Sequence, residues 1–357
     1  MSEAEILFVT RKWAPAMGGM ETYSLRLTEA IARQRGIEIV ALEGRANGMP
    51  PSPPALFGFP FTILRRWLAR KQAARVLHIG DMALWPVGLL AGAGTKVVLS
   101  AHGTDVSYHR RGGLKGRLYG TYLKLGAKLL KRATVIANSQ ATRAVAAETG
   151  WKDARVVPLA TDIAGAEVDG THNGRLLFAG RLVERKGCGW FIREVLPLLP
   201  AAIELDVAGT VWTDAERALL ADPRVRYLGP LAGAELAEAY RRALCVVVPN
   251  IPVASGEYEG FGLVAPEAAA AGGIVLAARC DGLVDAVIDG ETGILVEPGD
   301  PAAWRDAIVE IAQWDGSTRL DFAKTAMAVA SRRYSWDRVA SEVLAIYDEA
   351  ASSPRQA

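Results

Sequence analysis

The strongest constraint on the fold is a repeated alternation of short apolar runs with segments of helical periodicity. Glu5–Thr10 (EILFVT) and Ile37–Leu42 (IEIVAL) have the composition of buried strands, and Met20–Gln34 between them carries apolar residues at helical spacing. A strand–helix–strand unit predicts a parallel sheet. Lys96–Ser100 and Ala133–Ser139 are predicted as later strands of the same sheet.

The density of proline and glycine between Gly44 and Pro60 predicts a loop. At Leu159–Gly174 the apolar pattern lapses into small and polar residues, as in a linker, and the alternation then restarts. Strands of this second half are predicted at Arg175–Gly180, Ile203–Gly209, Cys245–Asn250, Gly273–Ala278 and Gly293–Asp300. We therefore predict two doubly wound α/β domains, residues 1–165 and 166–335, and a C-terminal helical segment, residues 336–357, that can cross back to the first domain.

The composition bounds the class of protein. A chain of 357 residues, half of them hydrophobic, is long enough for two cores. The acidic start MSEAEILFVT lacks the basic region of a secretory signal, and apolar runs such as Ala83–Gly94 are too short and too interrupted to span a bilayer. Cys188, Cys245 and Cys280 are scattered, which argues against zinc and favours a reducing compartment. The expectation is a cytoplasmic protein.

The net charge of +2 conceals an asymmetry between the two halves. Residues 1–160 hold 23 basic and 10 acidic side chains, a balance of +13, whereas residues 161–357 hold 18 and 29, a balance of −11. The first half is therefore the one expected to meet an anionic partner.

The stretch EYEGFGLVAPEAAAAGG, residues 257–273, places two carboxylates in one predicted strand-to-helix connection. Glu259 precedes Gly-Phe-Gly, and Glu267 follows Pro266 in the first turn of the predicted helix. Such connections lie at the carboxyl edge of a parallel sheet, where ligands bind. A carboxylate can accept both hydroxyls of a sugar diol, although a first-turn helix acid and a solvated loop acid explain the same residues.

Three further groups become informative only together. Arg181 and Lys186 in GRLVERKG follow a predicted strand and could hold a diphosphate, although exposed cations are common. Gly18 and Gly19 precede a predicted helix, a geometry that suits an anion but also an ordinary turn. His102 in SAHGTD follows another strand, where a single histidine is usually structural.

In their order along nearly the whole chain, these segments resemble the family 4 retaining glycosyltransferases of the GT-B fold, whose two Rossmann-like domains face a central cleft. The resemblance rests chiefly on the two glutamates of residues 259–267 combined with GRLVERKG. It implies a nucleotide-sugar donor, a UDP- or GDP-hexose, and no cofactor. The segment DGLVD (Asp281–Asp285) and the missing proline before Gly273–Ala278 depart from the family pattern and leave the identity of the hexose open.

The resemblance also implies a role for each candidate residue. Glu267 would accept the ribose hydroxyls of the donor. Glu259, with the backbone of Phe261, Gly262 and Leu263, would lie at the hexose and its phosphate. Arg181 and Lys186 would neutralise the departing diphosphate, Gly18 and Gly19 would approach the same phosphate, and His102 would lie at the donor sugar.

Charge development in such a reaction suits this set of residues. The leaving diphosphate gains negative charge, which fixed cations stabilise. No Asp-x-Asp pair occurs to bridge a metal to the diphosphate, so we expect transfer without a metal. The resemblance implies that configuration is retained and that the departing phosphate takes the acceptor's proton.

Three alternative functions stay open. They are a Rossmann-type oxidoreductase, whose G-x-G-x-x-G fingerprint is missing here, a nucleotide-sugar epimerase of the GT-B fold, and a non-catalytic protein that binds membrane surfaces.

The acceptor hypothesis comes from the basic half. Residues 108–132 contain eight Lys or Arg and no acid. On a helix, Arg117, Lys124, Lys128 and Lys131 would form one stripe, and Leu118, Tyr122, Leu125 and Leu129 another. This pattern, supported by the basic, apolar segment Phe61–Arg75, is typical of a helix on an anionic membrane, although a solvated helix with its apolar side on the core explains the apolar stripe. We predict a peripheral enzyme of the inner face of the cytoplasmic membrane, acting on a lipid-linked or glycan acceptor in cell-envelope or polysaccharide biosynthesis. Nucleic acid is not expected as a partner.

Overall fold

The computed structural model describes residues 4–16, 18–45, 49–70, 72–163, 165 and 167–349. The chain divides into two compact units. Unit 1 comprises residues 1–159 together with residues 336–357, and unit 2 comprises residues 160–335. The predicted terminal segment 336–357 is a helix over Trp336–Glu349, and the rest of it lies outside the described residues.

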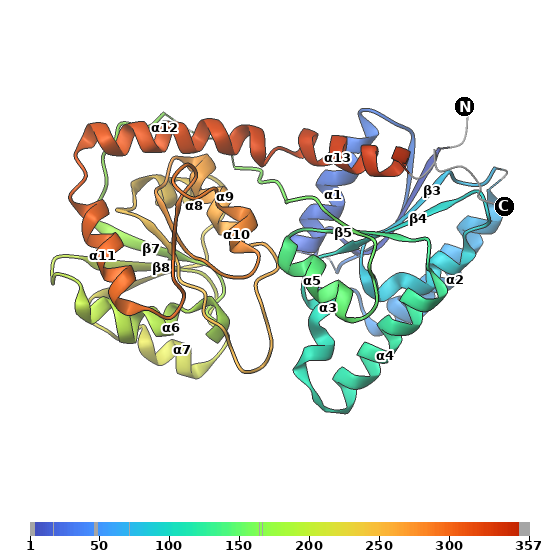
Figure 1. Ribbon diagram of the computed structural model, residues 1–357, viewed down its shortest axis with the longest axis horizontal. Coiled ribbons are helices and arrows are strands. Elements are labelled where there is room, and N and C mark those ends of the chain that lie inside the picture. Colours follow the sequence, from blue (N-terminus) through green and yellow to red (C-terminus); the bar gives the residue numbers. More distant parts are fainter. Residues whose placement is uncertain are drawn as a thin grey trace. The chain divides into compact units, whose positions relative to one another are not determined.

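Unit 1 is built on a parallel sheet of six strands in the order β2-β1-β3-β4-β5-β6 (Figure 1). These strands are β1 (Ile6–Trp13), β2 (Ile37–Glu43), β3 (Val76–Ile79), β4 (Lys96–Ala101), β5 (Thr134–Ala137) and β6 (Ala154–Val156). Its helices are α1 (Gly19–Ala32), α2 (Pro53–Ala69), the 3-10 helix η1 (Met82–Leu90), α3 (Thr104–Ser107), the 3-10 turn η2 (Tyr108–Arg111), α4 (Gly113–Leu129), α5 (Gln140–Glu148) and α13 (Trp336–Glu349). The first four residues of β1 are almost completely buried, as a central strand requires.

The helices of unit 1 cover both faces of its sheet. α1 and α13 pack together on one face, and α2, η1 and α4 lie on the other (Figure 1). Arg35 fastens α13 to the unit by two hydrogen bonds of 2.8 and 2.6 Å to the carboxylate of Asp348. The last helix of the chain is therefore an integral part of the first unit.

Unit 2 repeats the architecture with the strand order β12-β11-β10-β7-β8-β9, again wholly parallel among the described residues. Its strands are β7 (Arg175–Ala179), β8 (Glu204–Ala208), β9 (Val225–Gly229), β10 (Val246–Val248), β11 (Val275–Ala278) and β12 (Ile294–Val296). Its helices are the 3-10 turn η3 (Glu184–Lys186), α6 (Cys188–Trp190), the π-helical turn η4 (Phe191–Val195), the 3-10 turn η5 (Leu196–Leu198), α7 (Asp214–Leu219), α8 (Gly233–Arg242), α9 (Val264–Ala271), α10 (Leu283–Ala286), α11 (Pro301–Ala312) and α12 (Gly316–Arg333). The prediction of two doubly wound α/β domains is confirmed.

One prediction about local structure is wrong. The stretch from Gly44 to Pro60 was expected to be a loop, but α2 begins at Pro53. Pro53 and Pro54 occupy the first turn of the helix, where backbone N–H groups have no partner in the helix and their absence costs nothing. Pro60 lies inside the same helix, and residues 46–48 of the predicted loop lie outside the described residues.

Candidate functional site

The order of the strands in unit 2 reverses its direction between β7 and β10. From β7 the chain proceeds outward to β8 and β9, and then crosses to β10, which pairs with the other side of β7. The loops after β7 and β10 therefore adjoin at the carboxyl edge of the sheet, the usual ligand site of open α/β sheets. The first loop carries Arg181 and Lys186, and the second leads through Glu259 to Glu267.

The centre of this edge is a cluster of charges around one carboxylate oxygen. Oε2 of Glu259 forms an ion pair with Lys186, accepts a 2.7 Å hydrogen bond from Nη1 of Arg185, and accepts one of 3.2 Å from Nδ2 of Asn250. The side chains of Lys186, Arg185 and Glu259 are only 11%, 14% and 12% exposed. Burial opposes ionisation of Glu259, but the charges of Lys186 and Arg185 outweigh it and lower the pKa of the carboxyl to about 2.

Arg185 and Asn250 were not among the residues predicted from the sequence. Arg185 directly precedes Lys186 in the tight turn η3, and this places both cations on the same carboxylate. Arg185 also forms a 3.8 Å ion pair with the more exposed carboxylate of Glu257, so Lys186 is the cation of this cluster that, among the described residues, Glu259 alone pairs.

The segment DGLVD, which departs from the family pattern, supports the loop of Glu259. The backbone N–H of Glu259 donates to Oδ2 of Asp281 over 3.1 Å, and the N–H of Gly282 donates to the carbonyl of Glu259 over 3.0 Å. Gly262 has a φ of +90°, and a Cβ there would lie 2.4 Å from Cδ2 of Leu283. Only glycine therefore fits position 262, which lets the loop close tightly against α10.

The second glutamate lies in a drier environment. Glu267 stands in the first turn of α9, which follows the buried Phe261 and the N-cap residue Leu263. The hydroxyl of Tyr240, on α8, donates a 3.1 Å hydrogen bond to Oε2 of Glu267. Burial raises the pKa of Glu267 to about 7 despite this hydrogen bond and the charge of Lys186, so the carboxyl is partly protonated at neutral pH.

Arg181 occupies a more open position than Lys186. Its side chain is exposed, and its guanidinium lies over the indole of Trp212 with 5.2 Å to the ring centroid. Leu182 forms an isolated parallel bridge to Val211, which brings the two loops together. Trp212 is a further residue that the sequence analysis missed, because only this bridge brings it next to Arg181.

In unit 1, Gly18 is the N-cap of α1 and Gly19 its first residue. The carboxylate of Glu21, in the same first turn, approaches Gly18 so closely that a Cβ at position 18 would lie 2.5 Å from Oε2. Glu21 also forms a 3.3 Å ion pair with Nζ of Lys12, a residue of β1. An anion at this helix terminus would therefore share Lys12 with Glu21.

His102 is held from several directions at the end of β4. Its Nε2 donates a 3.0 Å hydrogen bond to the carbonyl of Gly80, which leaves Nδ1 as the unprotonated nitrogen of the neutral ring. The ring of Tyr23 packs edge-on with 4.6 Å between centroids. Asp105 accepts the backbone N–H groups of His102 and Gly103 over 3.0 and 2.8 Å. This histidine has a fixed tautomer and orientation.

In α4, the basic helix of unit 1, the apolar stripe predicted from the sequence does not pack on the core. Arg117, Lys124 and Lys128 are exposed on α4, and Lys131, also exposed, follows the end of the helix. The predicted apolar stripe faces solvent as well, with Leu118, Leu125 and Leu129 61%, 48% and 51% exposed. Only Tyr122 of that stripe is half-buried, and its hydroxyl donates to the carbonyl of Ala83.

The face of α4 that packs on the fold is instead lined by small residues. Its buried positions are Gly116, Gly120, Leu123 and Gly126. A Cβ at Gly126 would lie 2.7 Å from an indole carbon of Trp85 and 2.8 Å from one of Trp151. Because the glycine face packs against the fold, Leu118, Leu125 and Leu129 lie on the outer face of α4 together with its lysines.

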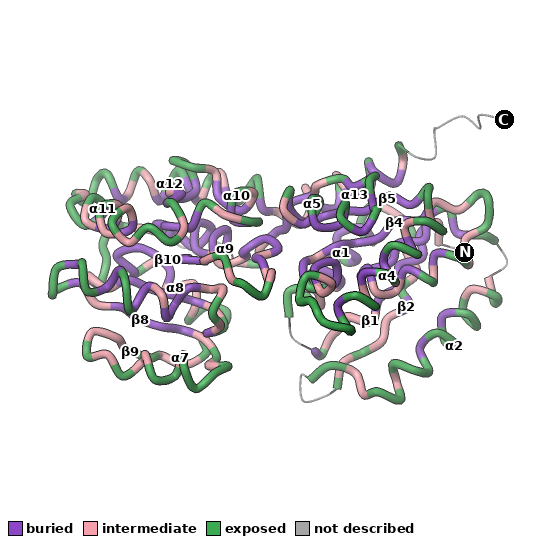
Figure 2. Tube along the Cα trace, turned by 60° about the horizontal axis from the view of Figure 1, so that its bottom comes forward, coloured by how far each residue is buried: buried purple, intermediate pink, exposed green. Residues whose placement is uncertain are grey.

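α2 shows a similar outer face. Phe57, Phe61, Leu64 and Leu68 fall on one side of this helix and are 80%, 75%, 40% and 72% exposed. α2 and α4 both contact η1 and lie on the same side of the unit 1 sheet, and much of α2 is exposed in Figure 2. Lys71, part of the basic segment Phe61–Arg75, lies outside the described residues.

No helix in the described ranges of the chain is both long enough and apolar enough to cross a bilayer. No group of three or more His, Cys, Asp or Glu side chains in the same ranges could hold a metal ion.

Two family models match the chain. Residues 17–164 match the model described as Glycosyltransferase Family 4, and residues 173–313 match the model described as Glycosyl transferases group 1. Together the two matches lie in both units.

Curated relatives with similar sequences are D-inositol 3-phosphate glycosyltransferases. That of Corynebacterium diphtheriae is 35% identical over 193 residues, which is 50% of this chain and 43% of the relative. That of Salinispora tropica is 33% identical over 237 residues, which is 60% of this chain and 48% of the relative. The match thus spans about half the length of these relatives.

Solved structures of similar fold cover nearly the whole chain. Anabaena HepE in complex with UDP and glucose aligns with a TM-score of 0.70 and 19% identity over 97% of this chain and 100% of that one. Sucrose-phosphate synthase from Thermosynechococcus elongatus aligns with a TM-score of 0.74 and 20% identity over 96% of this chain and 98% of that one. At this level of identity the alignments show the fold, that of the GT-B proteins.

Proposed function

This chain belongs to the family 4 and group 1 glycosyltransferases, and on that premise we propose that it transfers a hexose from a nucleotide-sugar donor, with retention and without a metal, to an acceptor at a membrane surface. The observation that carries the proposal is the cluster of charges where the loops after β7 and β10 adjoin. There Lys186 and Arg185 share the carboxylate of Glu259, and Glu267 follows in the same strand-to-helix connection. The solved structures of HepE are complexes with UDP and with UDP-glucose, which supports a nucleotide-sugar donor, and we propose a UDP- or GDP-hexose.

The cations of this cluster suit the departure of a nucleoside diphosphate. When the bond from the anomeric carbon to the phosphate oxygen breaks, the electron pair stays on the diphosphate, and nearby fixed cations stabilise the new charge. Lys186 is already desolvated and oriented by Glu259, so it need not be reorganised as the bond breaks. Arg181, stacked on Trp212, is the more open cation and would close on the diphosphate from the solvent side.

The two glutamates divide the donor between them in this proposal. Glu267 accepts the ribose hydroxyls, and Glu259, with the backbone of Phe261, Gly262 and Leu263, positions the hexose phosphate through Lys186. His102, Gly18 and Gly19 of unit 1 remain the proposed contacts to the donor sugar and its phosphate. The acceptor hydroxyl attacks the anomeric carbon on the face that the diphosphate leaves, its proton passes to the departing phosphate oxygen, and configuration is retained.

The outer face of α4 supports a membrane as the place of the reaction. Leu118, Leu125 and Leu129 stand exposed beside Lys124 and Lys128, which is the composition of a helix that lies in the plane of an anionic bilayer. Each cation near such a surface contributes about 1 kcal/mol, and the exposed apolar stripe of α2 adds surface for insertion. We therefore propose a peripheral protein of the inner leaflet whose acceptor is a lipid-linked glycan or a lipid of cell-envelope or polysaccharide biosynthesis.

One assay tests the activity directly. The full chain is incubated with UDP- or GDP-hexoses that thermal stabilisation has identified as ligands, and with acceptors that are either lipid-linked or soluble, inositol phosphate among them. We expect a new glycoside with the donor's anomeric configuration, formed equally well in EDTA. Interconversion of the sugar without any acceptor would mean an epimerase, and loss of activity in EDTA that Mg²⁺ restores would overturn the metal-free site.

A further inference from the structure

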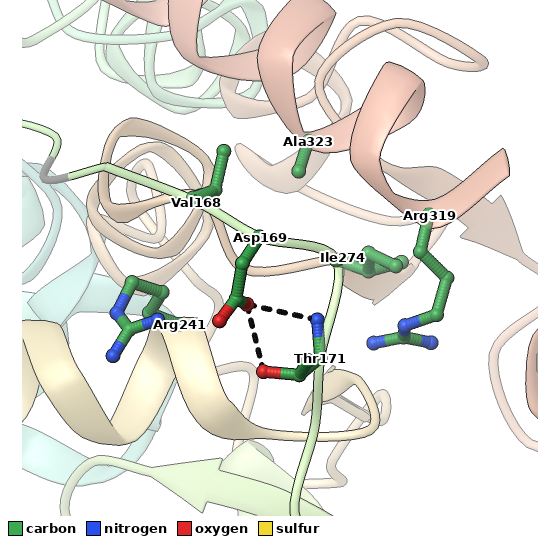
Figure 3. Close-up of a pocket in the computed structure, with 9 residues that line it drawn as sticks. Val168, Asp169, Thr171, Arg241, Ile274, Arg319 and Ala323 are labelled. Carbon is green, nitrogen blue, oxygen red and sulfur yellow. Dashed lines mark hydrogen bonds between the residues drawn. The ribbon is translucent and has the colours of Figure 1, made fainter. Parts of the chain in front are cut away.

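A pocket in unit 2 is lined by the residues of Figure 3. Gly272 and Ile274 of its lining precede β11, so the pocket lies at the amino ends of the strands, opposite the donor loops. The pocket is small and partly open to solvent, and its walls come from residues 168–171, α8, the end of α9 and α12. The side chain of Arg319, on α12, donates through Nη2 to the carbonyls of Ala243 and Leu244. These two residues lie just before the first residue of β10. The residues proposed to bind the donor follow the other end of that strand.

Arg319 is the unusual member of this pocket. The residue is only 5% exposed, yet two of its three guanidinium nitrogens, Nε and Nη1, are buried without a hydrogen-bond partner among the described residues. No carboxylate within those residues forms an ion pair with it, and burial lowers the pKa of its guanidinium. An arginine keeps its charge under such conditions, so the pocket contains a nearly dry, uncompensated cation.

A buried charge without a counter-charge is costly, and natural proteins normally pair it. A water molecule could accept one of the two free N–H groups but would not balance the charge. A tetrahedral oxyanion does both, because its oxygens are acceptors only and match the fork of a guanidinium.

The other polar groups of the pocket also favour a negatively charged ligand. Arg241 contributes a second guanidinium, which Glu238 holds through hydrogen bonds of 2.9 and 2.6 Å. The one acid of the lining, Asp169, is turned onto its own loop, where it accepts the N–H and the hydroxyl of Thr171 over 3.0 and 2.7 Å. Figure 3 shows these two bonds, with the guanidinium groups of Arg241 and Arg319 on either side of them.

We propose that this pocket is a binding site for an oxyanion of the phosphate class, held by Arg319 and Arg241. The site is separate from the donor loops, and the proposal does not rest on the function proposed above. Its ligand could be free inorganic phosphate or the phosphate of a small ester.

Inorganic phosphate is the probe that tests the site, titrated into the full chain at constant ionic strength against chloride. We expect an increase in melting temperature of a few degrees at saturation. A second readout is local, because the pKa of His172 is lowered by burial and by the charge of Arg319. Phosphate beside Arg319 should raise the pKa of His172, measured by NMR and assigned with His172→Gln. Glycerol phosphate in place of inorganic phosphate distinguishes an ester ligand from the free ion.

Three variants separate this site from others. Arg319→Gln should abolish the response of His172, whereas Arg242→Gln, the next residue of α8 but outside the pocket lining, should keep it. Lys186→Ala should also keep the response of His172, because it removes a cation of the donor loops only, where phosphate adds to the rise in melting temperature. If Arg319→Gln does not fold, Ala323→Leu fills the pocket with the arginine intact and should abolish the response of His172 too. An equal response in Arg319→Gln or in Ala323→Leu, or no response of His172, would show surface binding or a pocket that holds water, and would overturn the proposal.

Discussion

Nη1 of Arg185 donates a 2.7 Å hydrogen bond to Oε2 of Glu259, although the two residues lie 74 positions apart and follow different strands. The same oxygen carries the ion pair with Lys186. Glu259 thereby fixes two cations at the point where the loops after β7 and β10 meet. This arrangement makes the effect of removing any one of the three charges predictable.

Removing Lys186 from this cluster, or Arg181 from the same loop, should reduce turnover more than binding. Lys186→Ala and Arg181→Ala should each lower kcat about 10²–10³-fold, because their charges are needed most when the diphosphate leaves. Steady-state kinetics with the intact donor measures the effect, with Arg193→Ala as an exposed control on the following η4 turn. Near-normal kcat in both variants, with normal folding, would exclude the assignment.

The stability of unit 2 should depend on the ionised form of Glu259. Its pKa is lowered to about 2 from 4.5, so its contribution is fully present above pH 4.5 and is lost as the pH falls towards 2. Glu259→Gln leaves Lys186 largely buried without its counter-charge, and Arg185 with only the more exposed Glu257 at 3.8 Å, which costs about 3–5 kcal/mol at neutral pH.

Urea unfolding at pH 6 and at pH 3 tests this dependence. The difference in unfolding free energy between the original protein and Glu259→Gln should be large at pH 6 and smaller at pH 3. Glu310→Gln, an exposed position of α11, should show a small difference at both. A difference that does not change with pH would mean that packing, not charge, holds this loop.

Nucleotide affinity should rise with pH because of Glu267. Its pKa is raised to about 7, and only the ionised carboxylate accepts both ribose hydroxyls. Calorimetry with UDP or GDP should therefore show an affinity about tenfold higher at pH 8 than at pH 6. Tyr240→Phe removes a hydrogen bond that favours the ionised form, so the rise should shift to higher pH.

The matched control for this experiment is Glu267→Gln, which cannot titrate. Its nucleotide affinity should be weaker and should keep only the pH dependence of the nucleotide itself. An identical pH profile in this variant and in the original protein would remove Glu267 from the ribose site.

The sequence was sufficient to predict those features that depend on local pattern. The apolar runs at Glu5–Thr10 and Arg175–Gly180 are β1 and β7, and the predicted connection with the two glutamates does join a strand to a helix. Strand β6 has only three residues, and β9 is largely half-exposed, so neither produces a recognisable apolar run. Such short elements are defined by pairing with a neighbour rather than by their own composition.

Features that arise from tertiary contact were not predictable. The contact of Arg185 with Glu259 depends on the order of β7 and β10 in the sheet, and that of Arg319 with the carbonyls before β10 depends on where α12 docks. The outer face of α4 is a related case, since periodicity predicted the leucine stripe but not which side of the helix would be buried. The glycines decided that, because they allow Trp85 and Trp151 to approach the helix.

Lipid binding should depend on both stripes of α4. In co-sedimentation with vesicles, binding should require anionic lipid, fall with salt, and be lost when Lys124, Lys128 and Lys131 become Glu. Replacing Leu118, Leu125 and Leu129 by Ser should weaken binding with no change in net charge, which distinguishes insertion from simple attraction. Arg143→Glu with Lys152→Glu, two exposed cations of unit 1 outside α4, is the control. Binding that is indifferent to lipid charge would contradict the membrane proposal and favour a soluble acceptor.

Occupancy of the Arg319 pocket should change nucleotide affinity, because two helices link it to Glu267. Tyr240, which hydrogen-bonds to Glu267, directly precedes Arg241 of the pocket. α9 carries Glu267 in its first turn and ends at the C-cap residue Gly272, which lines the same pocket. A shift of α8 upon phosphate binding would alter the Tyr240–Glu267 hydrogen bond, and such coupling is typically 5- to 150-fold and reciprocal. Titration of nucleoside, which cannot compete for a phosphate site, in the presence and absence of phosphate measures it. The effect should vanish in Arg319→Gln and in Tyr240→Phe. A nucleoside affinity that phosphate leaves unchanged would show that the pocket and Glu267 act independently.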